Sequence, residues 1–151
     1  TMGRSDNRRN PVSEAQNESM LDIHLDDAQE LKILNAGEHK LRITRADVVE
    51  NKSNPGRNNL RICVDDSSDP LVDDIYVYLV IPEKSWKDSD PKAYVRAVNR
   101  IKDFAGSFSV EVSGTSPSRY IGQEGWCDVT EEEDNRDGTM RNQVRRFIVK
   151  R

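Results

Sequence analysis

The feature that most constrains the fold is the alternating stretch at residues 74–82, which reads Asp-Ile-Tyr-Val-Tyr-Leu-Val-Ile-Pro. β-Branched and aromatic residues dominate it and Pro82 closes it, a pattern typical of a β-strand. Because side chains alternate along a strand, Tyr76, Tyr78 and Val80 share one face. The opposite face carries four aliphatic side chains suited to a core: Ile75, Val77, Leu79 and Ile81.

Four further segments are predicted to be strands. The first covers residues 38–50, where the apolar alternation slips by one residue between Ile43 and Ala46, which indicates a β-bulge that bends the strand. The Asp137-Gly138 pair predicts a hairpin turn between the last two strands. The remaining predicted strands are residues 60–64, 122–133 and 142–150.

One long helix is predicted between the third and fourth strands. Asp90 and Pro91 are a good N-cap and first-turn pair, and Gly106 is the expected end of the helix. One helical stripe, with Ala97 and Phe104 beside it, is expected to close one end of the domain; it consists of Tyr94, Val98, Ile101 and Ala105. The basic residues of the helix lie off that stripe: Lys92, Arg96, Arg100 and Lys102.

This order of three strands, one helix and two strands, with a bulged first strand, is the order of the OB-fold. That fold is a five-stranded, partly open barrel with a helix between strands three and four. The alternative is another α+β fold with a five-stranded antiparallel sheet. We therefore expect a mainly β protein with three parts: a disordered tail at residues 1–19, an N-terminal arm at residues 20–37 and an OB-fold domain at residues 38–151.

Composition narrows the class of protein. A hydrophobic fraction of 34% and a mean hydropathy of -0.82 are low for a compact domain of 151 residues, so part of the chain is expected outside the core. The sequence has no long apolar run, so we expect no transmembrane helix. Its N-terminal residues lack the apolar segment of a signal peptide, so we expect a cytoplasmic protein. Two cysteines, Cys63 and Cys127, suit buried thiols in a reducing compartment.

No catalytic or metal-binding constellation is visible in the sequence. His24 and His39 have no recognisable nucleophile or metal partner, and the glycine motifs that bind phosphates or dinucleotides are missing. The carboxylates gather in polar runs typical of exposed loops. The sequence therefore predicts a protein that is not an enzyme and that uses no cofactor and no metal.

Several local motifs carry a resemblance to a known family. The run at residues 34–43, Leu-Asn-Ala-Gly-Glu-His-Lys-Leu-Arg-Ile, opens the domain, and Glu50-Asn51-Lys52-Ser53 follows with Gly56 and Leu60. Near the end, Gly122, Val129 and Gly138 precede Arg141-Asn142 and a basic strand. Over residues 34–151 this resembles the small bacteriophage single-stranded DNA-binding proteins of the OB-fold type.

The resemblance implies an accessory protein of phage DNA replication or recombination that coats single strands in the host cytoplasm. Many single-strand binders end in an acidic tail that recruits partners, whereas this sequence ends Val149-Lys150-Arg151. The resemblance leaves open whether such a tail has been removed or whether partner recruitment differs. The acidic N-terminal arm is an alternative recruiting segment.

Single-strand binding requires cations for the phosphates and flat rings for the bases. In an OB-fold this surface is formed by the second and third strands and by the loops that join strands one to two and four to five. The candidate nucleic-acid-binding residues lie on the polar face of the strands, in the first loop, and on the last hairpin and strand: Arg42, Lys52, Arg57, Arg61, Tyr76, Tyr78, Arg141, Arg145 and Arg146. A net charge of -4 excludes neither this basic groove nor a plain solvated surface.

Two functions remain open at this point. In the first, the protein binds single-stranded DNA with little sequence preference, together with replication or recombination proteins and without a membrane. In the second, it is a non-catalytic interaction module or virion accessory protein on the same fold. Tyr76 and Tyr78 would then pack under a loop, the arm or a partner copy, since the sequence also allows a homodimer.

Overall fold

The computed structural model describes residues 20–149. The chain divides into two compact units, Thr1–Glu30 and Leu31–Arg151. The described part of the first unit contains one 3-10 helix, η2 (Leu25–Asp27), which buries no residue. The tail predicted at residues 1–19 lies outside the described residues, so its disorder stays a prediction.

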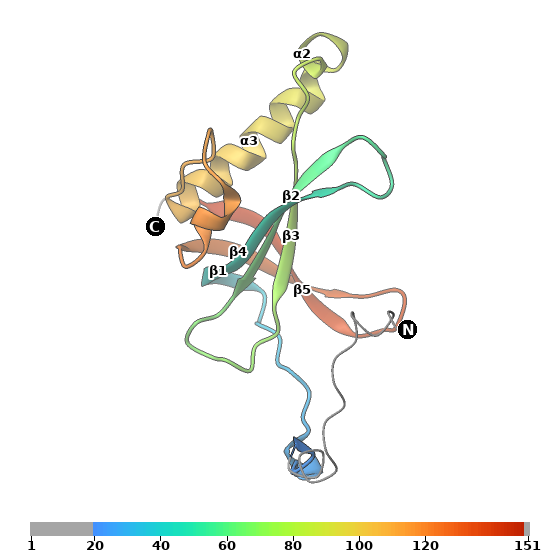
Figure 1. Cartoon of the computed structure of the whole chain (residues 1–151), viewed down its shortest axis with the longest axis vertical. Coiled ribbons are helices and arrows are strands. Elements are labelled where there is room, and N and C mark those ends of the chain that lie inside the picture. Colours follow the sequence, from blue (N-terminus) through green and yellow to red (C-terminus); the bar gives the residue numbers. More distant parts are fainter. Residues whose placement is uncertain (1–19, 150–151) are drawn as a thin grey trace, which may run out of the picture. The chain divides into compact units, whose positions relative to one another are not determined.

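The second unit is built on one antiparallel sheet of five strands in the order β3-β2-β1-β4-β5 (Figure 1). Between β3 and β4 the chain forms α2 (Trp86–Ser89), the long helix α3 (Pro91–Phe108) and the 3-10 helix η3 (Pro117–Tyr120). The predicted mainly β architecture with one main helix is therefore confirmed. The strands are β1 (Gly37–Glu50), β2 (Asn58–Asp65), β3 (Ile75–Val80), β4 (Glu124–Glu133) and β5 (Met140–Ile148).

The bulge predicted in the first strand is present and divides β1 into two halves. The first half pairs with β4 over Gly37 to Arg42, and the second pairs with β2 as far as Glu50. The register shifts between Ile43 and Arg45, so Thr44 is the extra residue. A bulge bends a strand and increases its twist. Strand β1 therefore joins the β2–β3 pair on one side to the β4–β5 pair on the other, and both pairs curve around the same core.

The sheet is not a closed barrel, which corrects the predicted five-stranded OB-fold barrel to an open, OB-like sheet. β3 and β5 contact each other, but no strand pairing joins them in the described residues. The segment before β1 accounts for this, because it bonds to both edges. Lys32 forms a parallel bridge with Val72 just before β3, and the Leu34 N–H donates to the Asn142 side chain of β5 at 2.7 Å.

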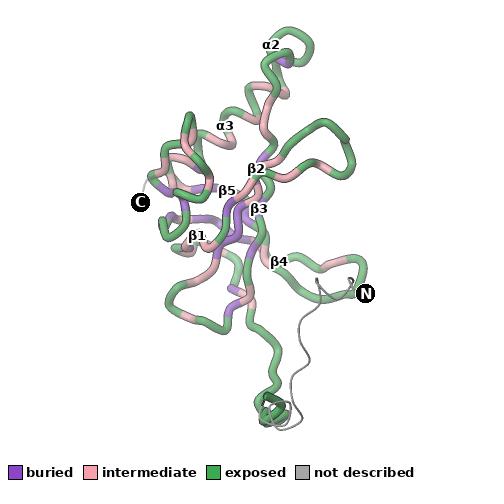
Figure 2. Tube along the Cα trace, in the orientation of Figure 1, coloured by how far each residue is buried: buried purple, intermediate pink, exposed green. Residues whose placement is uncertain are grey.

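The core lies where the long helix meets the sheet, and Figure 2 shows buried chain concentrated at the crossing strands. The Phe104 ring centroid is 5.3 Å from that of Phe108, 5.5 Å from that of Phe147 and 5.8 Å from that of Tyr120. Tilted and edge-on contacts at these distances are the favoured aromatic geometry. Helix α3 is therefore attached to the sheet mainly through its C-terminal turns.

Helix α3 differs from the prediction at its end and along its stripe. Asp90 caps it as expected, accepting a hydrogen bond from the Ala93 N–H at 3.3 Å. It then continues past Gly106 to Phe108, because burying the Phe108 ring outweighs the cost of about 1 kcal/mol for a helical glycine. The N-terminal half of the predicted core stripe is only partly covered, since Tyr94 is half-buried and Val98 is exposed.

Gly125 of β4 sets how closely helix α3 approaches the sheet. A Cβ at this position would lie 2.7 Å from the Ser107 carbonyl oxygen and 2.8 Å from the Phe108 ring. We therefore expect Gly125→Ala to lower the free energy of unfolding by about 1–3 kcal/mol, measured by urea denaturation. Gly106→Ala is the control, since its Cβ meets only the Val149 side chain; it should leave stability equal or higher. Equal losses in both variants would contradict this account.

Candidate nucleic-acid interface

The outer face of β2 and β3 presents two exposed tyrosine rings. Tyr76 is 46% and Tyr78 is 54% exposed, whereas the alternate residue Val77 is 5% exposed and faces the core. Tyr78 lies opposite Arg61 of β2, and Tyr76 lies opposite Cys63. Because directly opposite residues share a face, both rings and the Arg61 side chain belong to one surface. We call Arg61, Tyr76 and Tyr78 the tyrosine face.

The spacing of the two rings suits an unstacked strand. Residues two apart on a strand are separated by about 7 Å, twice the rise of one residue. Successive bases in a duplex are stacked about 3.4 Å apart along each strand. The tyrosine face therefore matches bases that have been separated from one another more closely than it matches duplex DNA.

Two of the predicted cations are paired with carboxylates across β1 and β2. Arg61 donates to both carboxylate oxygens of Asp47, at 3.0 and 2.7 Å. This bidentate bond raises the pKa of Arg61 and lowers the pKa of Asp47. Arg42 donates a single hydrogen bond to one carboxylate oxygen of Asp65, at 3.1 Å. Phosphates reaching either arginine must compete with a carboxylate that is already bound.

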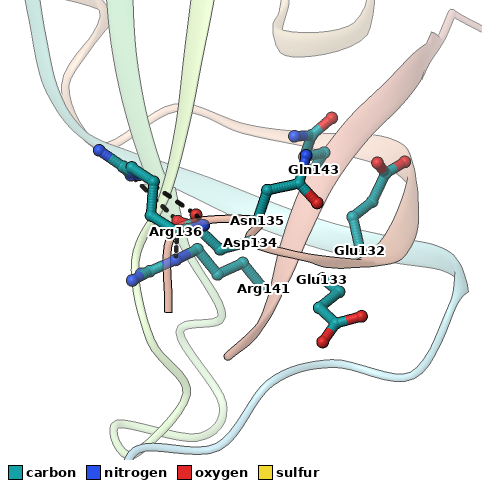
Figure 3. A pocket seen from close by; sticks show the side chains of 7 residues that line it. All are labelled: Glu132, Glu133, Asp134, Asn135, Arg136, Arg141 and Gln143. Carbon is teal, nitrogen blue, oxygen red and sulfur yellow. Dashed lines mark hydrogen bonds and ion pairs between the residues drawn. The ribbon is translucent and has the colours of Figure 1, made fainter. Parts of the chain in front are cut away.

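The turn of the β4–β5 hairpin is an ion-pair cluster around one carboxylate. Arg136 and Arg141 both donate to Asp134, at 3.0 and 3.1 Å, and Figure 3 shows their side chains converging on it. The hydrogen bonds from Arg136 contribute most to holding the pKa of Asp134 well below its usual range. Arg141 also reaches Asp137 at 3.4 Å. The cluster rigidifies the turn and reduces its net positive charge.

The other two predicted cations of β5 share a buried carboxylate. Asp128 of β4 is 8% exposed and accepts a hydrogen bond from the Arg145 Nε at 3.2 Å. Arg146 lies 3.6 Å from the same carboxylate. A buried carboxylate needs such partners, so these two arginines have a structural task at the sheet. Neither lines the grooves that adjoin the tyrosine face.

Among the described residues, the predicted cations that form no ion pair lie in the β1–β2 loop. Within residues 20–149, neither Lys52 nor Arg57 has a carboxylate within 4.0 Å. The Arg57 guanidinium instead lies 4.7 Å from the centre of the Trp86 ring of α2, a cation–π contact that fixes its place without neutralising it.

Three functional candidates were not among the predicted site residues: Trp86, Arg96 and Arg100. With Arg57 and Tyr78 they line a groove of about 390 Å³ between β3 and α3. Arg100 is held by hydrogen bonds to the Val144 and Arg145 carbonyls, at 3.2 and 3.1 Å. The signal in the sequence was the spacing of four between Arg96 and Arg100, which puts both on one helix face. The sequence could not show that this face adjoins β3.

Each of the two tyrosines lines a different groove. Tyr78 lines the groove with Arg57, and Tyr76 lines a second groove, of about 200 Å³, with Arg141 of β5. The second groove also contains Asp73 and Asp74. The structure therefore brings Arg57, Arg61, Tyr76, Tyr78 and Arg141 into one neighbourhood.

The described residues contain no group of three or more His, Cys, Asp or Glu side chains placed to hold a metal ion. Within residues 20–149 no helix combines the length and the apolar character needed to cross a bilayer.

Comparisons with known proteins add little. No protein-family model matches the chain, and no curated protein matches it. A solved structure, yeast RPA bound to ssDNA, is similar over 92% of this chain and 87% of that chain, with 11% identity and a TM-score of 0.35. A TM-score this low carries neither fold nor ligand from one protein to the other.

The thiol of Cys63 reports whether Tyr76 covers it. Cys63 is 3% exposed opposite Tyr76, and burial is the main cause that raises its thiol pKa. We expect Tyr76→Ala to expose Cys63, so that one thiol per chain reacts rapidly with Ellman's reagent at pH 8. The unsubstituted protein should react slowly at both cysteines.

Two controls belong to this measurement. Tyr78→Ala should leave Cys63 protected, because Tyr78 lies opposite Arg61. Cys127 is an internal control, since burial raises its pKa to about 12 and it should stay unreactive in both variants. Slow labelling of Cys63 in Tyr76→Ala would show that another group covers it.

Proposed function

We propose that residues 38–151 form an OB-fold domain that binds single-stranded DNA with little sequence preference. The observation that carries this proposal is the pair of half-exposed tyrosine rings on the outer face of β3, with open cations beside them. Base–aromatic stacking contributes about 1–3 kcal/mol per base and tolerates every base. A core strand has no need of two neighbouring phenol rings in water.

The electrostatic part of the site is local. Among residues 20–149, Arg57 and Lys52 of the β1–β2 loop have no carboxylate within 4.0 Å, while the partly exposed ion pairs of Arg61 and Arg141 can exchange a carboxylate for a phosphate. Acidic residues elsewhere restrict where the strand can lie. A role in phage replication or recombination, the tail at 1–19, the arm at 20–37 and a homodimer stay predictions from the sequence.

The test is fluorescence anisotropy of a labelled thymidine oligonucleotide at low and moderate salt. We expect salt-sensitive binding that unlabelled duplex competes with poorly. The double variant Tyr76→Ala/Tyr78→Ala should bind at least about 30-fold more weakly, the minimum for two lost stacking contacts. The matched control Tyr76→Phe/Tyr78→Phe keeps both rings and should retain affinity.

Two results would overturn the proposal. Absence of binding at low salt would favour the alternative of a protein-interaction module, in which the tyrosine face contacts a protein. Unchanged affinity in the double alanine variant, with the fold verified by its unfolding transition, would remove the tyrosine rings from the binding surface.

The pairing of Arg61 with Asp47 leads to a further prediction. Asp47→Asn should free the Arg61 guanidinium for a phosphate, so affinity should rise at low salt. The slope of log binding constant against log salt concentration should become steeper by about 0.7, the value for one added phosphate contact on a single strand. Glu111→Gln removes the same charge from the loop after α3 and should leave the slope unchanged. Equal slopes in Asp47→Asn and the unsubstituted protein would show that Arg61 does not reach a phosphate.

A further inference from the structure

The groove between β3 and α3 differs in charge from two other grooves of the described residues, one at the β4–β5 turn and one beside Tyr76. Its lining contains three arginines and no carboxylate: Arg57, Tyr78, Val80, Trp86, Ala93, Arg96, Ala97 and Arg100. By contrast, the groove at the β4–β5 turn contains Glu132, Glu133 and Asp134, and the groove beside Tyr76 contains Asp73 and Asp74. Of these three grooves, only the one between β3 and α3 has no carboxylate in its lining that would repel an anionic occupant.

The walls of this groove are preformed. Trp86 is 8% exposed, and the Arg57 guanidinium lies over its ring. The tryptophan ring therefore holds that cation in place. Arg100 is fixed by two β5 carbonyls and by the Phe147 ring, 4.8 Å from its guanidinium carbon. Arg96 is exposed on the same helix face and has no carboxylate within 4.0 Å among residues 20–149.

The apolar part of the groove is lined by small side chains. Ala93 and Ala97 are one helical turn apart on α3 and leave room above the helix, while Val80 continues the outer face of β3 beyond Tyr78. The volume of about 390 Å³ lies in the range of about 300–1,000 Å³ found for small-ligand pockets. A flat ring with an attached anion satisfies both the apolar walls and the arginines.

We propose that this groove binds one nucleotide of the strand that crosses the tyrosine face, with its base over Val80 and the two alanines and its phosphate between Arg57 and Arg96. The proposal rests on the proposed single-strand binding, because Tyr78 belongs to both surfaces. It extends the binding surface from two bases to at least three. It also adds helix α3 and the α2 tryptophan to the surface predicted from the strands and loops.

The first test uses the emission of Trp86. The chain has two tryptophans, so Trp126→Phe leaves Trp86 as the single reporter. Addition of saturating thymidine oligonucleotide should change the emission of Trp86, because a nucleotide in the groove displaces water and shifts the Arg57 guanidinium on its ring. Unchanged emission at saturation, with binding verified by anisotropy of the labelled oligonucleotide, would overturn the groove proposal and leave the proposed function standing.

The second test separates charge from shape. Arg96→Ala should weaken binding and make the salt slope shallower by about 0.7, the loss of one phosphate contact. Lys102→Ala is the matched control, since Lys102 is exposed on the same helix and does not line the groove; it should leave the salt slope unchanged. Ala97→Phe fills the groove without altering charge and should weaken binding by a similar factor.

The outcomes distinguish the two proposals. Equal affinity and slope for Arg96→Ala, Lys102→Ala and the unsubstituted protein would exclude the groove while the tyrosine variants still decide the function. Equal losses in Arg96→Ala and Lys102→Ala would indicate a general effect of helix charge and would also overturn the groove. Absence of oligonucleotide binding in the unsubstituted protein would remove both proposals together.

Discussion

The bulge at Thr44 is the constraint on which the rest of the structure depends. Strand β1 changes partner from β4 to β2 at that point, so its two halves join the β4–β5 pair and the β2–β3 pair in one bent sheet. The same bend brings the β1–β2 loop and the β4–β5 hairpin out on the same side of the sheet in Figure 1. Cations contributed by segments some 80 residues apart thereby flank a single strand, β3. The candidate site is a consequence of one extra residue in a strand.

The positive charge available at the candidate site depends on which arginines and lysines are paired with carboxylates, more than on how many the sequence contains. Five of the seven predicted cations have a carboxylate partner, as the pairs of Arg61 with Asp47 and Arg141 with Asp134 illustrate. Such pairs hold side chains in place while they reduce the positive field over the surface. Ring stacking does not require a net field, so an acidic protein can still bind a polyanion if its flat rings are exposed and a few cations remain open.

Local patterns in the sequence predicted the elements well, because each follows from residues close together in the chain. The alternation around Tyr76 identifies β3, the slip after Ile43 identifies the bulge, and Asp90 with Pro91 identifies the start of α3. Features that depend on distant residues were not predictable. The Asn142 side chain bonds to Leu34 across 108 residues and, with Lys32, accounts for the open sheet. The ion pairs likewise depend on strand register, which the sequence does not state.

The surface along β3 is electrically asymmetric, and under the proposed function this asymmetry decides where the phosphates of a bound nucleic-acid strand are held. Asp73 and Asp74 precede Tyr76 at the beginning of β3, whereas Arg57 and Arg96 adjoin Tyr78 toward its end. At the first end the one arginine of the groove, Arg141, is already paired with Asp134, so a phosphate is held more weakly there than beside Arg57 and Arg96 at the second end. Two tyrosines on a uniform surface would accept a strand in either direction, since stacking is nearly indifferent to polarity. Every nucleotide carries a phosphate whichever way the strand runs, so the charges along β3 set where the backbone is held most tightly and not which way it runs.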